Sequence, residues 1–167
     1  RLKLFLEKIG ILNKIDFDIE EVGQPIPFRW GKCKLATVSF GHGITTTPLQ
    51  LAKGYAIIAN GGLEIKPSLI KKNLKDNQSQ KRIIKEGVSE QINKILRKIV
   101  TTKQGTAELA NIKGYEIGGK TGTAEKAVVG GYTRKAKVNT FASIFPTSKP
   151  KYVMIVLLDE QIGRAHV

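Results

Sequence analysis

The segment Gly114–Tyr132, GYEIGGKTGTAEKAVVGGY, holds a Lys-Thr pair among glycines, and two unrelated chemistries use that arrangement. Residues 114–121 match the G-x-x-x-x-G-K-[ST] pattern of a loop whose backbone N–H groups cradle the phosphates of a nucleotide. Alternatively, Lys120 and Thr121 belong to an extended strand that presents a cation and hydroxyl groups to a bound substrate. The flanking elements must decide between the two.

A phosphate loop requires a buried strand before the first glycine and a helix that begins at the Lys-Thr pair. The residues before Gly114, ELANIK, are polar and helical in character, and the three glycines within ten residues after Thr121 disfavour a long helix. Tyr152–Glu160, YVMIVLLDE, resembles an apolar strand whose final acid binds magnesium. The connection to it is nevertheless too short for a parallel crossover. A P-loop nucleotide-binding protein therefore stays as the alternative from a different class.

The strand interpretation fits the same residues better. Ile117–Glu125 is predicted to be an edge strand along which a substrate backbone pairs as an added strand. Gly118, Gly119 and Gly122 lack the side chains that would block this approach.

The polar side chains of this strand predict its chemistry. Lys120 is a cation held at the cleft, and Thr121 and Thr123 place hydroxyls on one face, because strand positions two apart share a side. The hydroxyls can bind a carboxylate, and a backbone N–H of the strand can form half of an oxyanion hole. The remaining interpretation is a glycine-rich hairpin without a chemical role.

Helix signals dominate the first half of the chain. Arg1–Gly10 has one apolar face and a glycine stop, whereas residues 13–34 read as irregular. Thr47 is predicted to cap a helix in a capping box with Gln50, and the helix ends near Ala59 at Asn-Gly-Gly. Ser89 is predicted to cap a second helix. Its expected buried face consists of Ile92, Ile95, Leu96 and Ile99.

Strand signals follow. Leu63–Lys71 and Lys81–Lys85 are strand-like and flank the polar turn KDNQSQ, and Gly105–Ala110 is a short helical turn. Three closing strands are predicted, and their short connections imply antiparallel pairing. They are residues 115–125, 138–145 and 152–158. The fold class is therefore mixed α/β (α+β), with helices on an antiparallel sheet.

Composition limits the function classes. The net charge of +14 comes from 22 Lys and 6 Arg scattered without an aromatic-interleaved stripe, so no nucleic-acid partner is predicted. Cys33 is a single cysteine, so neither a disulfide framework nor a thiolate metal site is expected. We expect His42 to position a turn, and no metal or other cofactor is predicted.

The chain end has an unusual feature. Residues 162–167, IGRAHV, are the translation of the string ATC GGA AGA GCA CAC GTC, which resembles a common sequencing-adapter read. We therefore expect an artefact at 162–167 and natural sequence over residues 1–161.

Three segments together resemble the transpeptidase domain of class B penicillin-binding proteins, most of all the septal, cell-division type. They are Ser39–Gly62, which includes the FGHG sequence, Gly105–Lys126 and Phe141–Glu160. The resemblance implies the serine β-lactamase/penicillin-binding transpeptidase fold, incomplete at both ends, with residues 1–161 as the C-terminal part of the domain.

The resemblance also implies an activity and residue roles. A serine nucleophile attacks the D-Ala-D-Ala end of a peptidoglycan stem peptide, and the acyl group passes to an amine. Lys120 would support proton transfer and carboxylate binding, and Thr121 and Thr123 would contact the carboxylate of substrate or drug. The Thr123 N–H would complete the oxyanion hole, Gly122 would permit close approach, and Gly119 belongs to the same substrate-binding stretch.

Parts of that machinery are expected outside this chain. Ser-x-Asn is absent from the sequence, and the nucleophile with its Ser-x-x-Lys motif is expected upstream of Arg1. Because loss of the nucleophile costs about a millionfold in serine hydrolases, the chain alone is expected to be inactive.

The implied partners are peptidoglycan stem peptides and β-lactams. The resemblance further implies a membrane anchor outside this sequence, division-complex partners and a location at the periplasmic face of the bacterial inner membrane. A penicillin-sensing receptor domain and a β-lactamase are the alternatives with the same fold.

Overall fold

The computed structural model describes residues 1–71, 81–128 and 131–160. The predicted turn KDNQSQ (75–80) and the expected artefact at 162–167 lie outside these residues. The chain divides into two compact units, residues 1–93 and 94–167. Each unit has its own buried residues.

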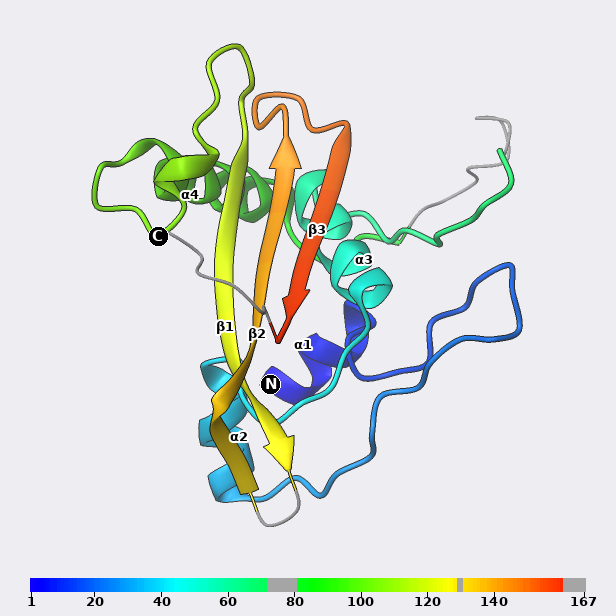
Figure 1. The fold of residues 1–167 in the computed structure, drawn as a ribbon. Coiled ribbons are helices and arrows are strands. Elements are labelled where there is room, and N and C mark those ends of the chain that lie inside the picture. The colour runs from blue at the N-terminus through cyan, green and yellow to red at the C-terminus, as the bar shows by residue number, and fades with distance from the viewer. Residues whose placement is uncertain (72–80, 129–130, 161–167) are drawn as a thin grey trace. The chain divides into compact units, whose positions relative to one another are not determined.

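The first unit is built mainly from helices (Figure 1). It contains α1 (Leu2–Lys8), α2 (Lys32–Ser39), α3 (Pro48–Ala59) and the first half of α4 (Glu86–Thr101). The buried cluster consists of Ile9, Ile11, Ile57 and Ile84. Ile57 is fully buried, so α3 lies at the centre of this core.

The two ends of α3 confirm the sequence prediction. Thr47 and Gln50 form the capping box, with Gln50 N donating to Thr47 Oγ1 at 3.2 Å. After Ala59, Gly61 and Gly62 take φ values of +86° and +89°. At Gly62 a side chain would collide with the carbonyl of Ile84, so a glycine is required there.

Gln50 also joins α3 to the segment after α1. Its side chain is fully buried, and Oε1 accepts from Thr47 N at 2.8 Å. Its Nε2 donates to Asn13 O at 2.6 Å and approaches Gly10 O at 3.4 Å. One side chain thus satisfies backbone groups of two segments that lie far apart in the sequence.

Two regions of the first unit differ from the sequence prediction. Residues 32–34, expected to be irregular, begin α2. The two strand-like stretches, 63–71 and 81–85, form only the single bridge Leu63↔Arg82. Pro67 lacks the N–H that a regular ladder would need, which accounts for the interruption of the first stretch.

The helix α4 corrects two further predictions. It begins at Glu86, so Ser89 is not its cap but lies in the first turns, where its hydroxyl donates to Ile58 O. The buried stripe consists of Ser89, Asn93, Leu96 and Val100. Ile95, expected to be buried, is 56% exposed. The polar members of the stripe donate to carbonyls at the end of α3, and Asn93 Nδ2 donates to Ala59 O. A prediction from the spacing of apolar residues alone cannot detect such polar contacts.

The second unit contains the antiparallel sheet that the sequence predicts. Its strands are β1 (Gly118–Val128), β2 (Gly131–Phe145) and β3 (Tyr152–Asp159), in the order β1-β2-β3 (Figure 1). The short helix η2 (Glu108–Ala110) precedes them, as expected from Gly105–Ala110. β2 is buried on both faces at Ala142, Ser143 and Ile144, and the apolar Ala142 and Ile144 belong to the core of this unit.

We predict that Gln50→Met destabilises the protein by about 2–4 kcal/mol, because the Thr47 N–H and the Asn13 carbonyl lose their buried partner. The measurement is the free energy of unfolding in denaturant. Gln91→Met, an exposed change on α4, is the matched control and should stay within about 0.5 kcal/mol. Equal effects of both changes would contradict the linking role of Gln50.

Candidate substrate-binding strand

The Lys-Thr-Gly sequence lies in an extended strand. Residues 118–128 form β1, at one edge of the three-stranded sheet of the described residues. No helix begins at Lys120, so the P-loop alternative is wrong. The edge-strand prediction is confirmed, and alternate backbone N–H and C=O groups of β1 face away from β2.

The register places the predicted site residues on two faces of β1. Thr121 lies opposite Phe141 and Thr123 opposite Asn139, so these four side chains share one face. Lys120 and Gly122 alternate with the threonines and lie on the other face.

Polar neighbours hold both threonine hydroxyls. Thr121 Oγ1 lies 3.0 Å from Thr106 Oγ1, in the turn before η2. Thr123 Oγ1 donates to Asn139 Oδ1 at 3.0 Å. The Lys120 ammonium donates to Thr121 O at 2.5 Å and approaches Thr121 Oγ1 at 3.4 Å. The structure therefore brings the cation and the first hydroxyl together.

The turn that carries Thr106 is fixed by the end of α4. Gly105 N donates to Thr102 O at 2.7 Å, and a side chain at Gly105 would collide with the carbonyl of Ile99. Ala107 is buried on the other side of Thr106. The roles of Thr106 and Asn139 do not follow from the sequence motifs. For Thr106, the only local signal is the neighbouring Gly105, where a side chain would collide with Ile99 O.

The three glycines of β1 have different reasons to be glycine. A Cβ at Gly119 would lie 2.7 Å from Ala142 O and from the Phe141 ring. At Gly118 it would lie 2.5 Å from the Thr147 methyl group and 3.0 Å from Arg97 N. The nearest atoms to a Cβ at Gly122 belong to Thr140 at 4.0 Å. Internal packing thus explains Gly118 and Gly119, whereas Gly122 leaves open space beside the strand.

A polar clamp fixes the start of β1. Glu116 O accepts from Thr147 N at 2.8 Å, and its carboxylate accepts from the hydroxyl and, at 3.2 Å, the N–H of Ser148. Arg97 Nη1 donates to Ile117 O at 2.7 Å. The hydrogen bonds from Ser148, helped by the charge of Arg97, lower the pKa of Glu116.

A second clamp lies beyond the site. Lys126 Nζ contacts Asp159 Oδ1 at 2.8 Å and Glu160 Oε1 at 2.6 Å. Hydrogen bonds to these two carboxylates raise the pKa of Lys126. Together the clamps fasten both ends of the stretch that contains Lys120–Thr123.

Comparison with known proteins identifies the family. The family model described as penicillin binding protein transpeptidase domain matches residues 1–165. The chain belongs to this family. It is 33% identical to a probable peptidoglycan D,D-transpeptidase FtsI of Caulobacter vibrioides, over 99% of the chain and 30% of that protein. The chain thus spans less than a third of that relative's length.

Solved structures agree with the family. The transpeptidase domain of penicillin-binding protein 3 from Burkholderia pseudomallei superposes with a TM-score of 0.88 at 27% identity, covering 95% of this chain and 49% of that one. Penicillin-binding protein 3 from Mycobacterium tuberculosis in complex with aztreonam gives 0.84 at 27% identity, covering 96% and 40%. The predicted transpeptidase fold is therefore confirmed.

The Ser-x-x-Lys pattern, expected only upstream of Arg1, also occurs within this sequence at Ser68–Lys71 and at Ser148–Lys151. Neither lies in a helix. Ser68 Oγ donates to Asp18 Oδ2 at 2.7 Å, and the Ser148 hydroxyl donates to Glu116. Both hydroxyls serve local hydrogen bonds, so neither is assigned as the nucleophile.

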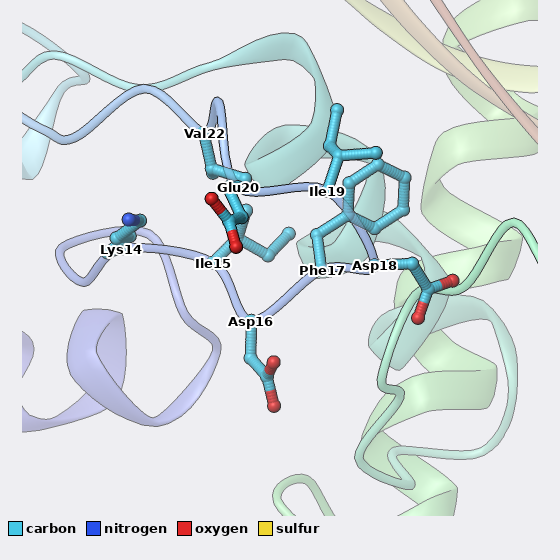
Figure 2. A pocket seen from close by; sticks show the side chains of 8 residues that line it. All are labelled: Lys14, Ile15, Asp16, Phe17, Asp18, Ile19, Glu20 and Val22. Carbon is cyan, nitrogen blue, oxygen red and sulfur yellow. The ribbon is translucent and has the colours of Figure 1, made fainter.

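The remaining candidates lie apart from this strand in the sequence. A pocket of about 600 Å³ in the first unit is lined by residues 14–20 and 22 (Figure 2). Its Asp16 pairs with Lys66, and its Asp18 accepts from Leu69 N at 2.6 Å. His42 lies in the turn after α2, where its N–H bonds Thr37 O at 3.0 Å.

The part of the chain that the structure describes contains neither a metal-binding cluster nor a membrane-spanning helix. No cluster of three or more His, Cys, Asp or Glu side chains there could hold a metal ion. Likewise, none of its helices combines the length and apolar character needed to cross a membrane.

We predict that Gly119→Ala lowers the free energy of unfolding by about 1–3 kcal/mol, because the added methyl group collides with Phe141 and Ala142. Gly122→Ala is the matched control. It should be neutral or stabilise by up to about 1 kcal/mol, since its space is open and it has no positive φ. Denaturant unfolding measures both, and equal losses would refute the distinction.

The Glu116 clamp predicts a dependence of stability on pH. Because the folded pKa of Glu116 is lowered, its contribution is present above the ordinary value of about 4.3 and disappears as the pH falls through the lowered pKa. The melting temperature of the wild type should exceed that of Glu116→Gln at pH 7, and the gap should close toward pH 3. A gap that widened on acidification would contradict the clamp. Glu108→Gln, an exposed change in the same unit, is the control.

Proposed function

We propose that residues 1–161 are the C-terminal part of a peptidoglycan D,D-transpeptidase domain of the septal, cell-division type, and that β1 binds the end of the donor peptide. The observation that carries this proposal is the extended edge of β1 at Lys120–Thr123 with open space at Gly122. Residues 162–167 are taken as adapter-encoded.

Binding begins with strand addition. A stem peptide ending in D-Ala-D-Ala lies along the free edge of β1 and pairs with its outward N–H and C=O groups. The missing side chain of Gly122 lets the peptide approach the strand backbone. A β-lactam takes the same place as an imitation of the peptide end.

Charge and hydroxyl groups then orient the ligand. The terminal carboxylate accepts hydrogen bonds from Thr121 and Thr123, and Lys120 supplies the positive charge beside Thr121. The Thr123 N–H donates to the oxygen on which negative charge develops when the carbonyl is attacked. Gly119 contributes through packing, since its missing side chain lets Phe141 lie against the strand.

The covalent step uses a serine from a part of the protein outside this sequence. Its oxygen attacks the carbonyl of the penultimate D-Ala, and an acyl-enzyme forms as the last D-Ala leaves with a proton on its nitrogen. An amine of a neighbouring peptidoglycan stem peptide then attacks the acyl-enzyme, and the serine regains its proton as the new amide bond forms. Lys120 assists these proton transfers through its charge.

Partners and location follow the same proposal. The Caulobacter relative is named a peptidoglycan D,D-transpeptidase, and the Mycobacterium neighbour is in complex with aztreonam, a β-lactam. Peptidoglycan stem peptides and β-lactams are accordingly the proposed ligands. An anchor outside this sequence would hold the domain at the periplasmic face of the inner membrane with division proteins.

We predict that Lys120→Ala slows labelling of the full-length protein by a fluorescent penicillin about 100-fold or more, because a preorganised charge at the reacting group is lost. Lys113→Ala, an exposed lysine of the same unit, is the matched control and should label as the wild type does. Gly122→Ala should also slow labelling while the protein stays folded. A wild-type protein that is not labelled at all would overturn the proposed function.

A further inference from the structure

The Thr123 hydroxyl donates a hydrogen bond to a residue of the neighbouring strand β2. Thr123 Oγ1 donates to Asn139 Oδ1 at 3.0 Å, and the two residues lie directly opposite in the register of β1 and β2. Asn139 also lies opposite Leu158 of β3, so it occupies the central strand between two ladders. Its backbone is therefore fixed on both sides, and only its side-chain amide can change direction.

The direction of this proton decides what Thr123 can bind. A threonine hydroxyl has one proton, and an ionised carboxylate accepts hydrogen bonds but donates none. While the proton points to Asn139, Thr123 has none to offer a ligand carboxylate. A ligand at Thr123 therefore competes with Asn139 for the same proton.

An amide can resolve this competition without moving the backbone. When the Asn139 amide turns by half a rotation, its NH₂ group replaces the oxygen and donates to Thr123 Oγ1. The Thr123 proton is then free for the ligand. A carboxylate at position 139 could only accept, and an aliphatic side chain could do neither.

Thr121 has a different kind of partner. Its neighbour Thr106 is itself a hydroxyl, which reverses a hydrogen bond by rotating a single hydrogen. Lys120 also approaches Thr121 Oγ1 as a donor at 3.4 Å. Of these two threonines, Thr123 is thus the one whose proton depends on the orientation of an amide.

We propose that Asn139 is a positioning residue that sets the proton direction of Thr123 and so controls how strongly β1 holds a ligand carboxylate. The proposal rests on the proposed function, and it assigns a specificity role to a side chain of β2. Asn139 acts only through Thr123 and touches no reacting atom.

The test measures the second-order rate of acylation of the full-length protein by a fluorescent penicillin. Asn139→Asp, which has nearly the same shape, should lower the rate about 10–100-fold, because it holds the proton and repels the carboxylate. Asn139→Leu should lower it about 3–10-fold, because no amide N–H is left to donate to Thr123 Oγ1 and direct its proton toward the ligand. Asn139→Thr should stay within about threefold, since a hydroxyl both accepts and donates.

The same changes in a Thr123→Val background separate positioning from packing. Asn139→Leu should then have no further effect, within about twofold, because the group through which it acts is absent. Equal losses in both backgrounds would overturn the proposal, and so would wild-type rates for Asn139→Asp. Melting temperatures verify that each variant is folded, and Asn139→Asp, which has nearly the same shape as the wild type, remains decisive where Asn139→Leu does not fold. An unlabelled wild type would instead overturn the proposed function.

Discussion

The register of β1 against β2 is the constraint on which the candidate site depends. Glu125 pairs with Lys137 but Lys126 pairs with Thr133, so three residues of β2 bulge out between them. Without this shift, counting outward from the hairpin would place Ala136 opposite Thr123. With it, Asn139 stands there and can bind the threonine hydroxyl. The polar face of β1 is therefore defined by an irregularity of its partner strand.

Close packing accounts for two of the three glycines of β1, one on each face. Gly118 faces the backbone of α4, and Gly119 leaves room for Phe141, so neither position can carry a side chain. Only Gly122 has space that the protein itself does not fill. Gly118 and Gly119 are therefore required by packing within the protein, whereas Gly122 is the glycine that a bound peptide would need. The sequence alone shows three glycines and does not reveal this difference.

Binding of a peptide end requires a strand that stays in place while its edge remains free. The Glu116–Ser148 hydrogen bonds and the Lys126 ion pairs fasten β1 on either side of Lys120–Thr123. Both sets of contacts run from β1 toward β3 or the β2–β3 connection, and they leave the outer edge of β1 unoccupied. The arrangement suits the proposed binding of a ligand along this edge, because it holds the strand in place beside the ligand.

Local signals such as caps, glycines and strand periodicity are sufficient to predict the three closing strands, their antiparallel pairing, the capping box of α3 and the Lys-Thr-Gly strand. The start of α2, the buried stripe of α4 and the partners of Thr121 and Thr123 become visible only in the folded chain. These depend on which carbonyl or side chain another segment brings near. Contacts between distant segments, unlike caps and turns, produce no local pattern in the amino-acid sequence.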